Sequence, residues 1–214
     1  TKWEIHKLED EFAEGALRCK KAGIDGVQLH CSHGYFLQQF LSPYTNRRTD
    51  EYGGSLENRT RIIKEIIEKI HKLCGPDYPI SARLTVDEYY RLFGYDVGYT
   101  LDEGVRIAKK LEELGIQFLD LSCGTYETMN AWCEPTSYEL GWRKDNAKAI
   151  KAAVSIPVAT VGKVSVVNAP VGTTVTASFE LDNIDRMPLG DIVGTMETLI
   201  QLNDSVDFVY RHTV

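Results

Sequence analysis

The sequence contains no long apolar run and no long basic run. Its apolar stretches are shorter than the roughly 18 to 20 residues that span a bilayer, and its N-terminus lacks the basic flank and apolar segment of a signal peptide. The formal net charge of −7, with 26% charged residues of both signs, argues against nucleic acid or an anionic membrane as the main ligand. We therefore expect a cytoplasmic globular protein with no nucleic-acid or membrane partner.

Paired cysteines are also missing. The five cysteines are widely spread and never arranged as C-x-x-C; they are Cys19, Cys31, Cys74, Cys123 and Cys133. This pattern indicates neither a disulfide framework nor a zinc or iron–sulfur site, and we expect reduced, mostly buried thiols. Three further histidines, His6, His71 and His212, offer the pair His30 and His33 no third metal ligand at a suitable spacing. No metal and no iron–sulfur cluster are expected.

The chain does contain a regular alternation of helical and extended patterns. Helices are predicted over residues 4–22, 58–73, 101–114 and 142–153, and in the first two the apolar residues recur at intervals of three and four. Ser55 is the predicted N-cap of the second helix. The helices are followed by the strands "GVQLH", "PISARLT", "FLDLS" and "IPVATVG". Such strict alternation predicts parallel strands with crossover helices.

The sequence also repeats itself. At an offset of 92 residues, "AGIDGVQLHC" (22–31) and "LGIQFLDLSC" (114–123) share a helix-closing Gly, the following Ile and the final Cys. Stacked copies of one unit leave such similarity, and a closed barrel of parallel strands is its commonest setting. A doubly wound open sheet remains possible, but no G-x-G-x-x-G follows any strand.

Polar residues at the strand ends are candidates for a functional site, because barrels of this type carry their chemistry at the carboxyl ends of the strands. Period-2 alternation places Gln28 and His30 on one side of the first strand. His33 and Tyr35 follow in the next loop. Arg83, near the end of the second strand, would be a buried guanidinium that needs an anion or a polarised ligand atom.

Four stretches of the sequence resemble one known family. The stretch "DGVQLHCSHGYFLQQFLSPYTNRRTDEYGGSLENRTR", with "ARLTVDE", "GIQFLDLSCGTYE" and "AIKAAVSIPVATVG", is similar to the old yellow enzyme family of flavin-dependent oxidoreductases. Within it, the bacterial NADH:flavin oxidoreductase and 2,4-dienoyl-CoA reductase branch is most similar, over residues 1–163. The resemblance implies a (βα)8 TIM barrel, FMN, electrons from NADH or NADPH, and a small α,β-unsaturated carbonyl substrate.

The resemblance also implies roles for individual residues. His30 and His33 match the pair that binds the substrate carbonyl oxygen and stabilises a developing enolate. Tyr35 matches the tyrosine that protonates the α carbon while hydride from the flavin reaches the β carbon. Arg83 matches the arginine beside the flavin pyrimidine edge, and Gly162 closes the matched stretch as a further cofactor-binding candidate.

Structural interpretations compete with these roles. The two histidines could be satisfied core residues, Tyr35 a packed aromatic, and Arg83 could pair with Asp87 or Glu88 nearby. The polar stretch 47–61 is interpreted as a charged loop that holds the start of the second helix. Three aromatic residues either flank the mouth or only pack there; they are Tyr126, Trp132 and Trp142.

The end of the chain departs from the family pattern. Four helix–strand units are recognisable, so a partial barrel is expected, and no Gly-Arg turn for an FMN phosphate is present. Residues 165–214 contain no lysine, two arginines and seven acidic residues. "TTVTASFEL" alternates like a strand with one wet face, a helix follows Pro188, and "VDFVYRH" resembles a last strand. We predict an unrelated β-α-β module over residues 164–214, joined by fusion or rearrangement.

These motifs are consistent with two functions. The retained "HCSHGY" favours an FMN-dependent ene-reductase. The missing phosphate turn favours a non-catalytic barrel fragment whose C-terminal module serves structure or self-association. Open barrel edges invite pairing with another chain, so a homo-oligomer is expected in either case.

Overall fold

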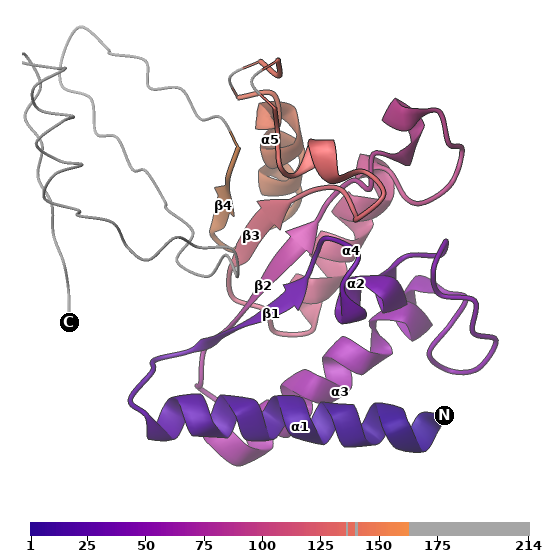
Figure 1. The fold of residues 1–214 in the computed structure, drawn as a ribbon. Coiled ribbons are helices and arrows are strands. Elements are labelled where there is room, and N and C mark those ends of the chain that lie inside the picture. The colour runs from indigo at the N-terminus through magenta and orange to yellow at the C-terminus, as the bar shows by residue number, and fades with distance from the viewer. Residues whose placement is uncertain (136, 140, 163–214) are drawn as a thin grey trace, which may run out of the picture. The chain divides into compact units, whose positions relative to one another are not determined.

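The structure, a computed structural model, describes residues 1–135, 137–139 and 141–162 (Figure 1). Within these residues, four parallel strands form one sheet in the order β1-β2-β3-β4. They are β1 (Val27–Cys31), β2 (Ile80–Thr85), β3 (Leu119–Ser122) and β4 (Val158–Thr160). The predicted α/β fold with a parallel sheet is confirmed. The predicted module at 164–214 lies outside the described residues.

Helices connect consecutive strands, as parallel strands require. The connecting helices are α3 (Leu56–Cys74), α4 (Leu101–Glu113) and α5 (Lys144–Ala153). Helix α1 (Lys2–Lys21) precedes β1, and the short α2 (Phe36–Leu41) follows it. Single 3-10 turns, η1 (Tyr90–Phe93) and η2 (Met129–Ala131), follow β2 and β3.

The start of α3 is set by its cap. As predicted, Ser55 is the N-cap, and its Oγ accepts a hydrogen bond from the backbone N–H of Asn58 at 3.2 Å. The helix begins at Leu56, two residues before the predicted start. The difference arises because the buried isoleucine stripe first appears at Ile62, whereas the cap at Ser55 fixes the backbone about two turns earlier.

The loop before α3 is held by Arg59. This buried side chain donates hydrogen bonds to the carbonyl oxygens of Gly54 and Leu41 and forms an ion pair with Glu103 on α4. It therefore fastens the polar stretch 47–61 to two neighbouring elements, in agreement with the structural interpretation of that stretch.

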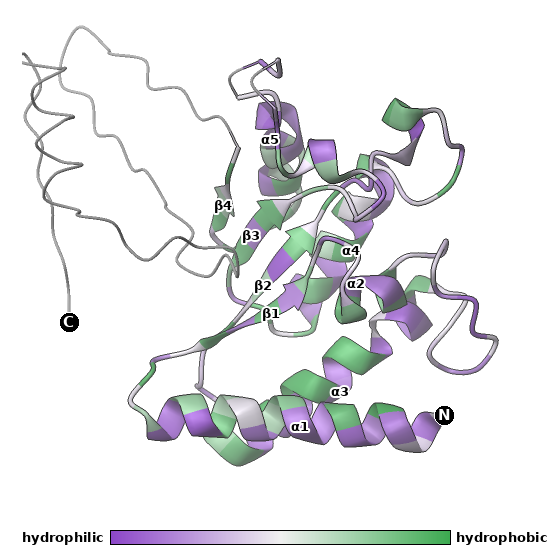
Figure 2. Cartoon of the chain, in the orientation of Figure 1, coloured by the Kyte–Doolittle hydropathy of each residue, from purple (hydrophilic) through white to green (hydrophobic). Residues whose placement is uncertain are grey.

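The two faces of the sheet differ in polarity. One face carries apolar side chains that are at most 3% exposed, namely Leu29, Cys31, Ile80, Ala82, Leu84, Leu119 and Leu121. They share a core with the stripe Ile62, Ile63, Ile66, Ile67 and Ile70 of α3. The alternate positions carry Gln28, His30, Ser81, Arg83, Asp120 and Ser122. Alternation along the strands, visible as changing colours in Figure 2, thus presents a polar face opposite the core.

The internal repeat has a structural counterpart in two similar helix ends. Gly23 after α1 and Gly115 after α4 have φ values of 85° and 101°. In each case the amide of the following isoleucine, Ile24 or Ile116, donates to the carbonyl five residues earlier, at 3.1 and 3.0 Å. These bonds form the Schellman motif that closes a helix before the next strand.

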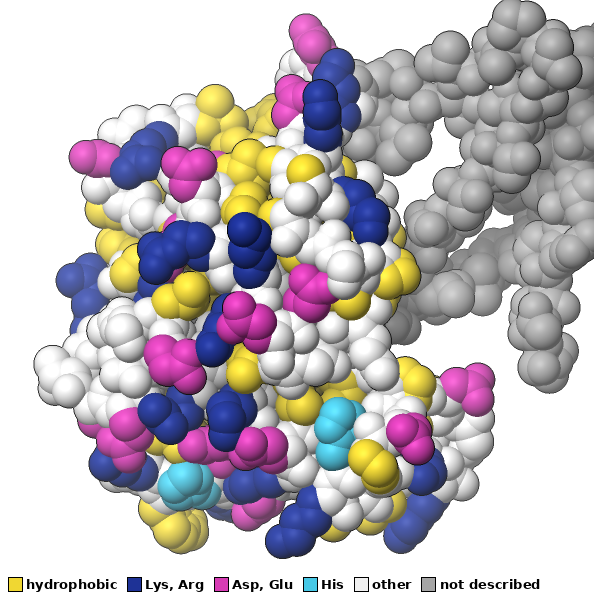
Figure 3. Space-filling view, turned by 180° about the vertical axis from the view of Figure 1, so that it is seen from behind, with side chains coloured by type: hydrophobic (Ala, Val, Ile, Leu, Met, Phe, Trp, Pro, Cys, Tyr) yellow, Lys and Arg dark blue, Asp and Glu magenta, His cyan; other side chains and the backbone are white. Residues whose placement is uncertain are grey.

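The visible surface in Figure 3 carries Lys and Arg interspersed with Asp and Glu. A face of mixed sign offers no extended patch for a polyanion. Within the described part of the chain, no helix is both long and apolar enough to cross a membrane.

Candidate active site

Three polar side chains lie in one row across the sheet. The strand register places His30 of β1 beside Arg83 of β2, and Arg83 beside Asp120 of β3. The row lies close to the carboxyl ends of the strands, where sites in parallel α/β sheets are usually built. The predicted residues His30 and Arg83 are therefore neighbours on the polar face.

Arg83 forms an ion pair with Asp120, at 3.1 Å between Nη1 and Oδ2. The alternative that Arg83 pairs with Asp87 or Glu88, which are near in sequence, is wrong. Asp87 accepts hydrogen bonds from the backbone N–H groups of Tyr89 and Leu101. Both acids follow the end of β2, so the chain carries them away from Arg83, whereas Asp120 lies beside it in register.

Asp120 was missed by sequence reasoning. Its side chain is 13% exposed, like the 11% of its partner Arg83, and such a pair in a poorly hydrated place fixes both side chains. A usable signal was present, because a carboxylate between Leu119 and Leu121 inside an apolar strand needs a partner on a neighbouring strand.

His33 lies in the loop after β1 and is only 7% exposed. Its Nε2 is 2.7 Å from Oγ of Ser122, and its backbone N–H donates to Oγ1 of Thr85 at 3.1 Å. Its ring stacks on Trp132, with centroids 4.5 Å apart. Its φ of 61° is uncommon for a residue other than glycine. The loop is thus held so that the imidazole sits against the ends of β2 and β3.

The His33 imidazole is neutral at neutral pH. Burial, with help from neighbouring cations, lowers its pKa from 6.5 to about 3. The electrostatic contributions that lower it further come, in order of effect, from Arg83, His30 and Arg143. A neutral ring has one N–H donor and one acceptor nitrogen. His33 is therefore equipped to donate a hydrogen bond without carrying charge.

Tyr35 completes a cluster of aromatic and imidazole rings. The His30 ring lies 5.3 Å from that of His33 and 5.1 Å from that of Tyr35. Tyr35 is 40% exposed, and its hydroxyl accepts a hydrogen bond from the Tyr126 hydroxyl at 2.7 Å. The structure thus brings together the three residues predicted to be catalytic. Tyr126, expected only as a possible flanking aromatic, contacts one of them directly.

Gly162 has a structural explanation. A Cβ at this position would collide with the Glu134 carboxylate and lie 2.9 Å from Cζ of Arg143. These two residues form a buried ion pair, and Trp142 donates its indole N–H to the same carboxylate. The need for glycine follows from this packing, and a cofactor contact of Gly162 stays a prediction. Trp142 therefore helps to hold the carboxylate of this ion pair in place.

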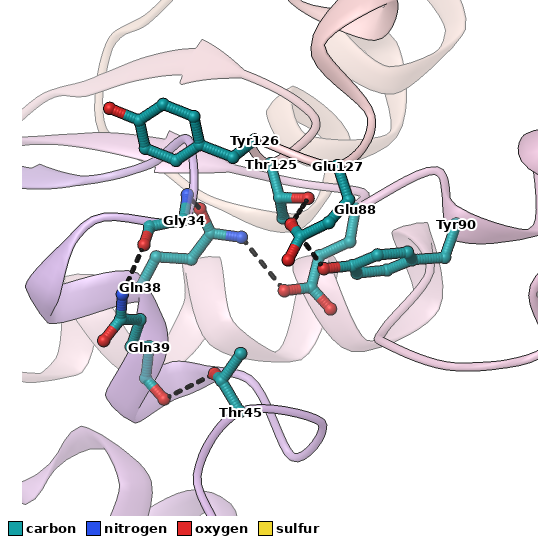
Figure 4. A pocket seen from close by; sticks show the side chains of 9 residues that line it. All are labelled: Gly34, Gln38, Gln39, Thr45, Glu88, Tyr90, Thr125, Tyr126 and Glu127. Carbon is teal, nitrogen blue, oxygen red and sulfur yellow. Dashed lines mark hydrogen bonds between the residues drawn. The ribbon is translucent and has the colours of Figure 1, made fainter.

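A polar cavity of about 120 Å³ lies next to Tyr126 (Figure 4). Its lining comprises Gly34, Gln38, Gln39, Thr45, Glu88, Tyr90, Thr125, Tyr126 and Glu127. Glu88 accepts hydrogen bonds from Gln38 and Ser42, each at 3.0 Å. Burial raises the pKa of Glu88 to about 7. The cavity is large enough for water and too small for an extended substrate.

Comparison with known proteins identifies the family. Residues 1–173 match the NADH:flavin oxidoreductase / NADH oxidase family. The NADH oxidase of Thermoanaerobacter brockii is 48% identical over 159 residues, which cover 74% of this chain and 24% of that protein. An NADPH dehydrogenase of Halalkalibacterium halodurans is 36% identical over 165 residues, covering 77% of this chain and 45% of that protein. The chain thus spans about a quarter to a half of these relatives.

Solved structures agree with this match. A complex of 2-naphthoyl-CoA reductase with 2-naphthoyl-CoA has a TM-score of 0.67 at 32% identity, over 75% of this chain and 24% of that chain. Morphinone reductase has a TM-score of 0.56 at 25% identity, over 75% and 40%. The resemblance to old yellow enzymes is confirmed, and the match extends to residue 173 where the motifs indicated 163. The chain belongs to the NADH:flavin oxidoreductase / NADH oxidase family of flavin-dependent oxidoreductases.

Proposed function

We propose that the chain carries the substrate-activating part of an FMN-dependent ene-reductase, with its sheet forming four strands of a (βα)8 barrel. The reaction is hydride transfer to an activated C=C bond of an enone or enoyl thioester, with electrons from NADH or NADPH. The observation that carries this proposal is the ring cluster of His30, His33 and Tyr35 at the strand ends. Relatives named cinnamate reductase, 2-naphthoyl-CoA reductase and morphinone reductase support an unsaturated substrate.

The two histidines would bind the substrate carbonyl oxygen. When the Ser122 hydroxyl donates to Nε2 of His33, the proton of the neutral ring lies on Nδ1, which can donate to a ligand. His30 is close enough to add a second donor. Donors held in position before the reaction stabilise the charge that develops on a carbonyl oxygen.

Tyr35 would act as the proton donor. Its hydroxyl oxygen is the acceptor in the hydrogen bond from Tyr126, so the hydrogen of Tyr35 itself is not used in that bond. Its 40% exposure leaves it reachable from the solvent side. A positioned acid of this kind typically contributes about 10²- to 10⁴-fold to a rate.

The residues present fit the ring of a flavin better than its phosphate. Arg83, held by Asp120 on the polar face, would place positive charge where a reduced, anionic ring needs it. Bound FMN would supply the hydride. The sequence contains no Gly-Arg turn for the phosphate, so we assign no phosphate contact.

Flavin binding is the direct test. The purified chain is expected to show a flavin absorption band or to quench FMN fluorescence in a saturable titration. Arg83→Ala should weaken that binding, whereas Arg18→Ala, an exposed arginine on α1, should leave it unchanged. A colourless chain that leaves FMN fluorescence untouched would contradict the assignment and favour the second candidate function.

That second candidate is a non-catalytic piece that associates with another copy of itself. It is favoured by an apolar groove of about 400 Å³ that includes Phe12, Ala16, Val27 and Leu29, beside β1. Among the described strands, β1 pairs with β2 alone, which leaves one strand edge beside the groove. Light scattering should then give at least a dimer mass, and Phe12→Asp should reduce it; a monomer would remove this candidate.

A further inference from the structure

A third histidine, His6, lies against two carboxylates between α1 and α3. Nδ1 of His6 is 3.1 Å from Oε2 of Glu9 and 4.0 Å from Oε2 of Glu65. One ligand atom from each residue lies within 4.8 Å of the other two. A tetrahedral ion with bonds of about 2.0 to 2.2 Å separates its ligand atoms by about 3.4 Å. Small side-chain movements would therefore close this triangle around an ion.

Glu9 gives the cluster its distinctive feature. Its side chain is 0% exposed, and its Oε1 has no hydrogen-bond partner within the described residues. Burying a carboxylate oxygen without a partner is costly unless a cation or proton compensates. His6 on the same helix is 54% exposed, so an ion could enter from solvent and retain a water ligand.

We propose that His6, Glu9 and Glu65 bind a divalent transition-metal ion of the Zn²⁺ type. One imidazole and two carboxylates form a donor set that suits Zn²⁺, Co²⁺ or Ni²⁺. The site is structural, because it joins α1 to α3 through residues that lie 59 positions apart in the sequence, from His6 to Glu65. That separation also explains why sequence spacing gave no sign of this site and why no metal was expected.

Two neighbours shape the site. The Tyr52 hydroxyl donates to Oε2 of Glu65 at 2.6 Å and orients that carboxylate. Lys69 competes with an ion, since its Nζ is 3.0 Å from Oε2 of Glu9. It also binds Asp10 at 2.6 Å and the backbone oxygen of His6 at 3.1 Å. Lys69 would therefore keep two partners when a metal takes the Glu9 oxygen.

The test is metal binding by the whole chain after treatment with a chelator. Zn²⁺ should bind saturably at one ion per chain by calorimetry, and Co²⁺ should develop the visible bands of a low-symmetry site. His6→Ala should weaken both by about 100-fold or more, since even outer-shell partners are worth about 10- to 100-fold. His71→Ala, a matched change on α3 outside the cluster, should leave binding unchanged.

Lys69→Met provides a second test, in which the Zn²⁺ affinity should rise rather than fall. Removing the competing ammonium should tighten Zn²⁺ binding if Glu9 is a ligand. The proposal is overturned if no saturable binding occurs, if His6→Ala binds as well as the parent chain, or if Lys69→Met weakens binding. None of these readouts depends on flavin or on turnover, so the result stands apart from the proposed reductase function.

Discussion

The two histidine clusters of this molecule have opposite electrostatic surroundings. His33 is buried beside the guanidinium groups of Arg83 and Arg143, which help to keep its pKa low. His6 lies half exposed against the carboxylates of Glu9 and Glu65. Burial and the neighbouring charges together decide what an imidazole can do. Burial, helped by nearby guanidinium groups, leaves His33 a neutral hydrogen-bond donor, whereas carboxylates make the His6 cluster attractive to a cation.

The largest expected effect belongs to the ring cluster at the strand ends. Tyr35→Phe should slow C=C reduction by about 10²- to 10⁴-fold in protein that retains flavin, because the proton donor is lost. Stopped-flow measurement should show flavin reduction by NADH unchanged. Equal loss in both half-reactions would argue against the proton-donor role.

A change at Tyr126 tests whether the role of Tyr35 can be distinguished from that of its hydrogen-bond partner. Tyr126→Phe removes only the hydrogen bond to Tyr35, so the rate should fall by roughly fivefold, the equivalent of about 1 kcal/mol. If Tyr126→Phe were as damaging as Tyr35→Phe, the proton donor would have to be reassigned to the pair.

The next largest effect is expected at the ion pair of Arg83 and Asp120, beside His33. Asp120→Ala removes one charge of an ion pair whose two side chains are little exposed, and should cost about 3 kcal/mol in urea unfolding. The double change Arg83→Met with Asp120→Leu should cost less, because both charges of the pair are removed together. A double variant that is as unstable as Asp120→Ala would show that packing, rather than charge, explains the loss.

Sequence patterns predicted the helices and strands better than the side-chain pairs that form between strands. Periodicity located the strand that carries His30, and Ser55 correctly marked the cap of α3, since both depend on residues near in sequence. Motif resemblance supplied Tyr35. Asp120 was missed because strand register, which no local pattern states, brings it beside Arg83.

The stability of the folded chain in acid should depend on His33. The pKa of His33 is about 3 in the folded chain and about 6.5 when unfolded, so the unfolded state binds the proton more readily. The associated stability is complete above pH 6.5 and is lost as the pH falls toward 3. His33→Gln should therefore flatten the pH dependence of the unfolding free energy over this range.

A second titrating group, Glu88, makes a comparison between the parent chain and His33→Gln necessary. Its pKa is raised from 4.5 to about 7, so its contribution to stability is present below pH 4.5 and is lost as the pH rises through 7. The two groups act in opposite directions over overlapping ranges. Only the difference between the parent and His33→Gln isolates the histidine, and an unchanged slope would contradict its low pKa.

The smallest effect is expected at His6 in metal-free protein. Because His6 is half exposed, His6→Ala should change the unfolding free energy by no more than about 0.5 kcal/mol in the presence of a chelator. Excess Zn²⁺ should raise the melting temperature of the parent and leave that of His6→Ala unchanged, since a ligand stabilises only the state that binds it. An equal shift in both would place the metal elsewhere and remove the contrast between the two clusters.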